Sequence, residues 1–96
     1  MSLGGAMSNL NLGALVREYR LKADMTQSDL AKKLGYESVQ FVSLFERGLS
    51  KIPINVLGQL IVILGISEKK ILNTLLSEYE LKVKNLIADG KKKSAY

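Results

Sequence analysis

Two short apolar patterns joined by a tight turn constrain this chain more than any other feature. The first, TQSDLAKKLG, begins at Thr26, and Asp29 three positions later forms a capping-box pattern with Asp in place of the usual Glu or Gln. Gly35 supplies a C-terminal stop. The second pattern follows Ser38, an expected N-cap, and runs to about Arg47. Helices of two turns are marginal alone in water, so both must pack against neighbours.

Apolar residues at helical spacing predict three further helices around this pair. The first begins after Asn11, an expected N-cap, and the fourth begins near Pro53 and ends at Gly65. Ser67 caps a fifth, longer segment that runs to residue 89. The expected buried residues are Leu12, Leu15, Val16, Tyr19 and Ala23, then Leu30, Ala31 and Leu34, then Val42 and Phe45, then Ile54, Leu57, Leu60, Ile61 and Leu64. No segment alternates as a strand does, so the expected fold class is all-α with five helices.

The composition argues against catalytic and metal sites. The chain has 96 residues, enough for one domain, and it contains neither cysteine nor histidine. Disulfides, thiolate zinc sites, cysteine nucleophiles and histidine acid–base chemistry are therefore excluded. A glycine-rich phosphate loop and paired carboxylates in a cleft are also missing, so we expect no enzyme, no metal and no cofactor.

The charge and the apolar runs bear on partners and location. The net charge is +5, and Lys91–Lys93 supply much of the excess. A basic balance permits DNA binding through phosphate contacts without requiring it. No apolar run reaches the roughly 18 residues that span a bilayer. We therefore expect no membrane segment and a cytoplasmic location.

The stretch TQSDLAKKLGYESVQFVSLFERG resembles the Cro/repressor-type helix-turn-helix family, also called xenobiotic-response-element-type regulators. The resemblance covers about residues 10–72 and includes the exit ERG and the later pattern IPxxxLxxL…LGI. It is greatest to the branch that reads LGYxSxQFIS…ERG, which has one more residue in the turn. The resemblance implies a compact five-helix, lambda-repressor-like DNA-binding domain, here with an extended C-terminal helix. In such domains the second helix of the pair presents its N-terminal residues to base edges in the major groove.

The resemblance also implies roles for particular residues. The expected DNA-binding residues are Gln27, Glu37, Ser38, Gln40, Ser43, Leu44 and Arg47. Gln27 corresponds to a residue that binds a phosphate, and Gln40 can donate to and accept from adenine. Arg47 is placed to reach phosphate or guanine, or to act as a favourable partner of the helix dipole. Leu44 replaces a residue that is polar in many relatives, and it contacts either a thymine methyl group or another protein.

Two further pairs of residues have alternative interpretations. Arg20 and Glu46 match an arginine and a glutamate that commonly form a structural salt bridge in the family, and the alternative is a direct contact with DNA. Phe41 is placed either to contact or intercalate between bases or, as the favoured interpretation, to pack on Tyr36.

The fifth helix carries the prediction of a homodimer. Leu72, Leu76, Tyr79, Val83 and Leu86 recur with spacing 4, 3, 4, 3, which is a heptad seam. We expect dimerisation through Leu76, Tyr79, Val83 and Leu86. The alternative is a helix that folds back over its own core.

The expected organisation and function follow from these features. Residues 1–7 are interpreted as a cloning remnant or disordered N-terminus, 8–72 as the helix-turn-helix domain, 73–89 as the helical extension and 90–96 as a basic flexible tail. The leading hypothesis is a prokaryotic or phage regulator, a repressor, that binds double-stranded DNA as a homodimer. The alternative is an antitoxin or protein-interaction module whose C-terminal helix binds a toxin or another regulator.

Overall fold

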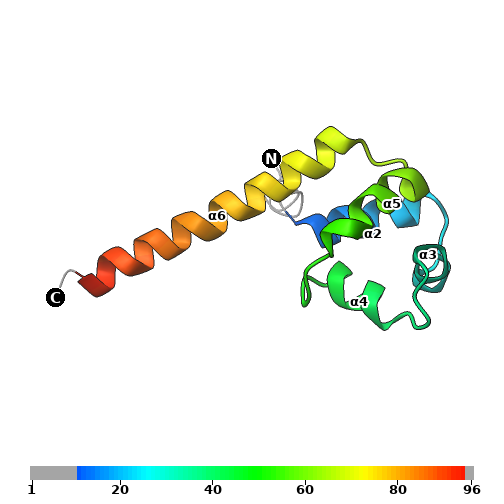
Figure 1. The fold of residues 1–96 in the computed structure, drawn as a ribbon, viewed down its shortest axis with the longest axis horizontal. Coiled ribbons are helices and arrows are strands. Elements are labelled where there is room, and N and C mark those ends of the chain that lie inside the picture. Colours follow the sequence, from blue (N-terminus) through cyan, green and yellow to red (C-terminus); the bar gives the residue numbers. More distant parts are fainter. Residues whose placement is uncertain (1–10, 95–96) are drawn as a thin grey trace.

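Five helices make up the computed structural model, which describes residues 11–94. They are α2 (Leu12–Lys22), α3 (Gln27–Leu34), α4 (Gln40–Glu46), α5 (Ile54–Leu64) and α6 (Glu68–Ser94). The first four form a globular unit, and α6 crosses it and then projects as a rod (Figure 1). The described residues contain no strand, and the predicted all-α class is confirmed. The expectations for residues 1–7, and for residues 95 and 96 of the tail, lie outside the described residues.

Polar caps begin three of the helices as the sequence predicts. The side chain of Asn11 accepts the N–H of Ala14 at 3.1 Å at the start of α2. Thr26 and Asp29 form a complete capping box at α3, with both hydrogen bonds at 2.9 Å. Ser67 Oγ accepts the N–H of Lys70 at 3.1 Å at the start of α6. These bonds satisfy N–H groups that the first turn of a helix leaves without backbone partners.

The capping box makes part of the stability depend on pH. The carboxylate of Asp29 accepts the backbone N–H of Thr26, and this bond, together with the Thr26 hydroxyl group beside it, lowers the pKa of Asp29 below its ordinary value of 3.8. Because the folded-state pKa is the lower one, this stabilisation is fully present above pH 3.8 and is lost as the pH falls through the lowered pKa. The stability difference between the wild type and Asp29→Asn should therefore shrink in acid, measured as the free energy of unfolding in urea from about pH 7 to pH 2. A difference that stays constant with pH would contradict this.

The core lies where α2 to α5 and the first turns of α6 meet. Its largest fully buried side chains are Val16, Leu30, Val42, Phe45, Leu60, Ile66 and Ile71. The prediction for α5 was partly wrong, because Ile54 is 83% exposed while Val56 is buried. The segment INVLGQLIVIL is apolar around most of its circumference, so periodicity does not identify the buried face. Ala23, expected to be buried, is the exposed C-cap residue of α2.

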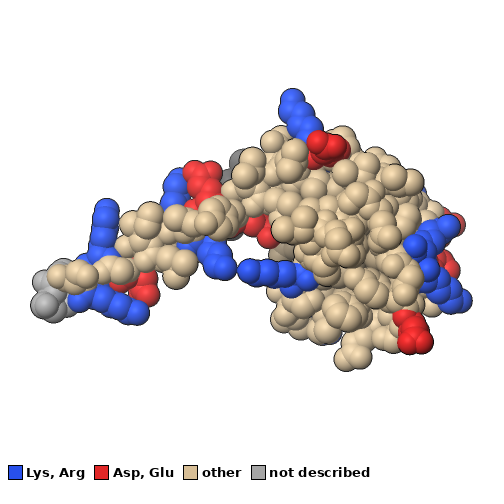
Figure 2. All heavy atoms as spheres, in the orientation of Figure 1, with Lys and Arg blue, Asp and Glu red and all other residues tan. Residues whose placement is uncertain are grey.

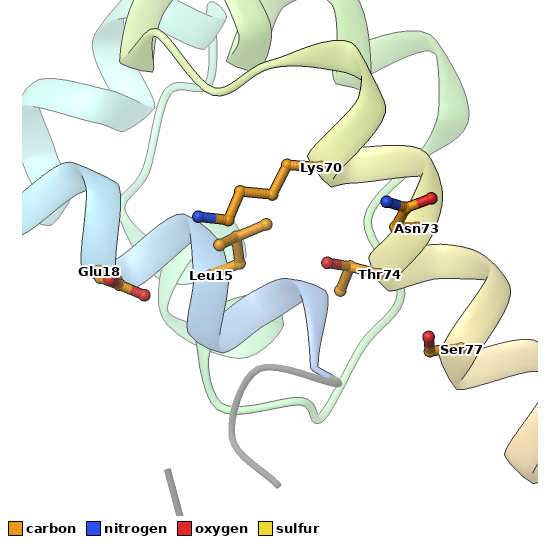
Figure 3. Close-up of a pocket in the computed structure, with 6 residues that line it drawn as sticks. All are labelled: Leu15, Glu18, Lys70, Asn73, Thr74 and Ser77. Carbon is orange, nitrogen blue, oxygen red and sulfur yellow. The ribbon is translucent and has the colours of Figure 1, made fainter. Parts of the chain in front are cut away.

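The first turns of α6 hold the helix on α2. Ile71 and Thr74 are buried there, and the Glu78 carboxylate accepts the N–H of Leu12 at the start of α2. An anion at a helix N-terminus is favoured by the helix dipole. Figure 3 shows this junction, a pocket of about 340 Å³ lined by Leu15, Glu18, Lys70, Asn73, Thr74 and Ser77.

The outer part of α6 leaves the domain. From residue 84 to residue 94 every side chain is exposed, and Figure 1 shows this part pointing away from the other helices. The alternative in which the helix folds back over its own core is therefore wrong for the described residues. The helix also continues through Gly90 to Ser94, beyond the end expected at residue 89. Two exposed ion pairs along this part of α6 join residues four positions apart, Lys84 with Glu80 at 3.0 Å and Lys93 with Asp89 at 3.4 Å.

Candidate nucleic-acid interface

The turn between α3 and α4 sets the angle at which the two helices meet. Gly35 has φ +85°, a left-handed conformation that glycine adopts without strain, and it ends α3. The N–H of Tyr36 then donates to the carbonyl of Ala31 at 2.9 Å. Behind the turn, Val42 and Phe45 of α4 are buried in the core. This packing fixes one face of α4 in the core, and the opposite face points outward.

The start of α4 differs from the prediction by one residue. Val39 occupies the N-cap position, and the predicted cap, Ser38, lies one residue earlier. Ser38 Oγ instead accepts the N–H of Gln40, two residues on, at 3.1 Å. This is a local turn that serine hydroxyl groups readily form in place of a helix cap. It places Ser38 and Gln40 together at the exposed N-terminal end of α4.

The predicted DNA-binding residues lie on the outside of this unit to different extents. Glu37, Ser38, Gln40 and Arg47 are exposed, and Ser43 and Leu44 are half-buried. Arg47 Nε donates to the carbonyl of Ser43 at 3.3 Å, so the guanidinium group sits against the last turn of α4. That position suits the dipole interaction and leaves the other guanidinium nitrogens for a second partner.

A buried ion pair joins α2 to the end of α4. Arg20 Nε donates to Glu46 Oε2 at 2.7 Å and Arg20 Nη2 donates to Oε1 at 3.0 Å, a two-point contact between residues that are each 6% exposed. Arg20 Nη1 also donates to the carbonyl of Met25 at 2.7 Å. The two residues that the resemblance implied as a pair are thus in contact, and the Met25 carbonyl is a third partner that the sequence did not indicate.

Gln27 extends this network to the start of α3. Its side-chain amide nitrogen donates to Glu46 Oε1 at 3.0 Å, so one amide hydrogen points inward. The backbone N–H groups of Gln27 and Ser28 stand at the first two positions of α3, where a helix has no internal acceptors for them. The network therefore fixes the end of α3 that is best suited to bind an anion.

Aromatic and basic side chains complete the surface. Tyr36 and Phe41 stack with ring centroids 4.9 Å apart and planes 13° apart, which confirms the favoured interpretation of Phe41. Phe41 remains 48% exposed despite this contact. Lys32 and Lys33 stand exposed in the last turn of α3, and Figure 2 shows basic side chains at the domain edge that α3 forms and along α6. The surface is polar and moderately basic.

The comparison with protein families identifies this unit. A family model described as helix-turn-helix matches residues 16–71, which contain α3, α4 and α5 entirely and most of α2. The chain belongs to the Cro/repressor-type, lambda-repressor-like helix-turn-helix family. Members are DNA-binding regulators, generally without catalytic activity, and the chain accordingly carries a DNA-binding helix-turn-helix domain. Neither the curated proteins nor the solved structures gave a match.

The match leaves the C-terminal part of the chain outside the family. It ends at residue 71, so nearly all of α6 lies outside it. Within residues 11–94, none of the helices combines the length and apolar character that crossing a membrane requires. The same residues hold no group of three or more acidic side chains placed to bind a metal ion.

Proposed function

We propose that this protein is a sequence-specific transcription regulator, a repressor, that binds double-stranded DNA as a homodimer with α4 in the major groove. The proposal rests on the exposed polar side chains at the start of α4 and just before it, Glu37, Ser38 and Gln40, since the other face of this helix is held in the core. A base-reading side chain needs such a rigid support, because specificity depends on where its donors and acceptors stand. The proposed setting is the cytoplasm of a prokaryotic or phage-infected cell.

In this proposal, the phosphate contacts lie at the edges of the surface that Glu37, Ser38 and Gln40 form. The start of α3, with Gln27, offers one phosphate the N–H groups that have no acceptor within the helix. Lys32, Lys33 and Arg47 supply positive charge nearby. Phosphate contacts position the domain, whereas base contacts confer the sequence preference.

Selection from a random duplex library, followed by titration of the enriched sites at several salt concentrations, tests the proposal. We expect a palindromic site with half-sites about 34 Å apart, one turn of DNA. Gln40→Ala should lose about 1–3 kcal/mol of preference, roughly 5- to 150-fold, and keep the salt slope, because Gln40 reads a base and not a phosphate. Gln59→Ala is the matched control, since Gln59 is an exposed glutamine on α5. If no site is enriched and the weak binding vanishes with salt, specific recognition by this chain is wrong.

The homodimer is assigned to the outer face of α6. Leu76, Tyr79 and Leu86 are 64%, 66% and 60% exposed, and Val83 lies half-buried between them. Large apolar side chains that repeat with heptad spacing and face solvent are what a partner helix covers.

The same exposed side chains favour a second candidate function. An antitoxin or other protein-interaction module would use them to hold a different protein, and Leu81 and Ile87, 47% and 53% exposed, widen the surface available. A toxin-like gene beside the gene for this protein would support this alternative. The mass of the purified chain by sedimentation equilibrium separates the two, since only the homodimer needs a second copy.

A further inference from the structure

The apolar seam of α6 has defined ends. It runs from Leu72 to Leu86, and the positions that would continue it are Lys69 on one side and Gly90 on the other. Gly90 has open space around the position of a Cβ among the described residues, and Leu72 is 48% exposed. In an antiparallel pair of helices, the a and d positions of the heptad face each other across the pair, so each layer joins one residue of each kind. The seam permits this arrangement in few registers.

One register pairs four of the five seam residues with one another. With residue 81 at the two-fold axis, Leu76 packs on the partner's Leu86 and Tyr79 packs on the partner's Val83, each twice. Leu72 then covers the partner's Gly90, where no side chain competes for the space. The alternative register, with the axis between residues 77 and 78, would place Leu86 against a lysine, Lys69. Burying an apolar side chain against a charged group loses much of the benefit of burial.

The charges along α6 favour the antiparallel direction. Residues 68–80 carry three acidic and two basic side chains, whereas residues 82–94 carry five basic and one acidic. A parallel pair would set the two strongly basic halves side by side, with Lys91–Lys93 of both copies together. An antiparallel pair sets each basic half beside a weakly acidic half, which removes that repulsion. Glu80, next to the two-fold axis at residue 81, forms an ion pair with Lys84 of its own helix at 3.0 Å.

The position of the domain on α6 favours the same direction. The side of α6 that packs on the domain, with Ile71 and Thr74, lies about a third of a turn from the seam. The two-fold axis of an antiparallel pair is perpendicular to both helices, so it leaves both domains on the same side of the pair. The axis of a parallel pair runs along the helices and sends the domains to opposite sides. In the antiparallel pair both domains, and with them both copies of α3 and α4, therefore lie on the same side of the two α6 helices.

We propose that the protein dimerises through an antiparallel pair of α6 helices with the two-fold axis at residue 81, so that both recognition helices face one DNA duplex. This inference rests on the proposed homodimer and adds its direction and register. The partner is a second copy of this chain, and the interface consists of Leu76, Tyr79, Val83 and Leu86 from each.

Disulfide cross-linking tests the direction directly, because the chain has no cysteine of its own. Leu76→Cys and Leu86→Cys replace exposed side chains, so both variants should fold. After mixing and mild oxidation, one copy carrying a size tag, we expect a disulfide between the two variants and none within either variant alone. In the antiparallel pair, like positions are ten residues apart along the axis, about 15 Å, which exceeds the Cα separation of about 7 Å that a disulfide spans.

The other outcomes overturn different parts of the inference. Cross-linking of each variant with itself and not with the other would mean a parallel pair, and the homodimer would stand without its proposed direction. A monomeric mass with no cross-link in any mixture would overturn the homodimer itself. Asn85→Cys, exposed on α6 but off the seam, is the matched control and should cross-link with none of the variants. DNA selection with the wild-type chain remains a separate measurement, so failure of the pairing is distinguishable from failure of DNA recognition.

Discussion

Glu46→Ala should lower the free energy of unfolding by about 3–5 kcal/mol, because it leaves the guanidinium group of Arg20 buried without its anion. Both side chains are almost inaccessible to water, so solvent cannot replace the lost carboxylate. The Met25 carbonyl retains one hydrogen bond to Arg20 but carries no net charge. Urea unfolding monitored by circular dichroism measures the effect.

An exposed ion pair within α2, the helix that carries Arg20, provides the control. Glu18 and Lys22 lie 3.2 Å apart with side chains 45% and 64% exposed, so Glu18→Ala should cost less than about 1 kcal/mol. Equal effects of the two substitutions would show that burial of the Arg20 pair does not matter. The double variant Arg20→Met/Glu46→Leu should recover much of the loss, because it leaves no unpaired charge in the core.

The network also connects stability with DNA binding. Glu46 Oε1 accepts from both Arg20 and Gln27, so the carboxylate that fixes α4 on α2 also orients the start of α3. We therefore expect Glu46→Ala to weaken specific DNA binding even at temperatures where the variant is folded. Titration of the selected site under those conditions checks this.

The sequence predicted features that depend on neighbouring residues. The caps Asn11, Thr26 and Ser67 act within three positions along the chain, so their residue types and spacing were sufficient. The same holds for Gly35 and Gly65, which end helices in left-handed conformations. The resemblance of the 26–48 stretch fixed the fold family, since the caps, apolar positions and ERG exit occur together.

Features that depend on distant residues were not predictable in this way. Gln27 contacts Glu46, 19 positions away, and Glu78 contacts the N–H of Leu12, 66 positions away. No local pattern marks either contact. Ile54 was misplaced because nearly every side of α5 is apolar, and the register is decided by which side meets α2 and α3.

Gly13 shows how a contact between helices can depend on one missing side chain. It is the second residue of α2 and is buried where α2 crosses α4. A Cβ built on Gly13 would collide with the carbonyl oxygen of Phe45 and lie 3.0 Å from its carbonyl carbon. Those atoms are backbone, so they cannot rotate away, and the two helices must move apart to admit even a methyl group. The sequence signal was present, since a glycine inside a helix is unfavourable unless something approaches closely.

Gly13→Ala should therefore destabilise the domain by about 3 kcal/mol and disturb the Arg20–Glu46 pair, which spans the same two helices. Gly58→Ala is the matched control, because Gly58 lies inside α5 and a Cβ there meets nothing within 4 Å among residues 11–94. Alanine favours the helix over glycine by about 1 kcal/mol, so Gly58→Ala should stabilise the domain. Opposite signs in urea unfolding would separate the collision from helix propensity. If both substitutions stabilise the protein, α2 and α4 are not in close contact at Gly13, and the position of α4 depends on the Arg20–Glu46 pair and on its own core face alone.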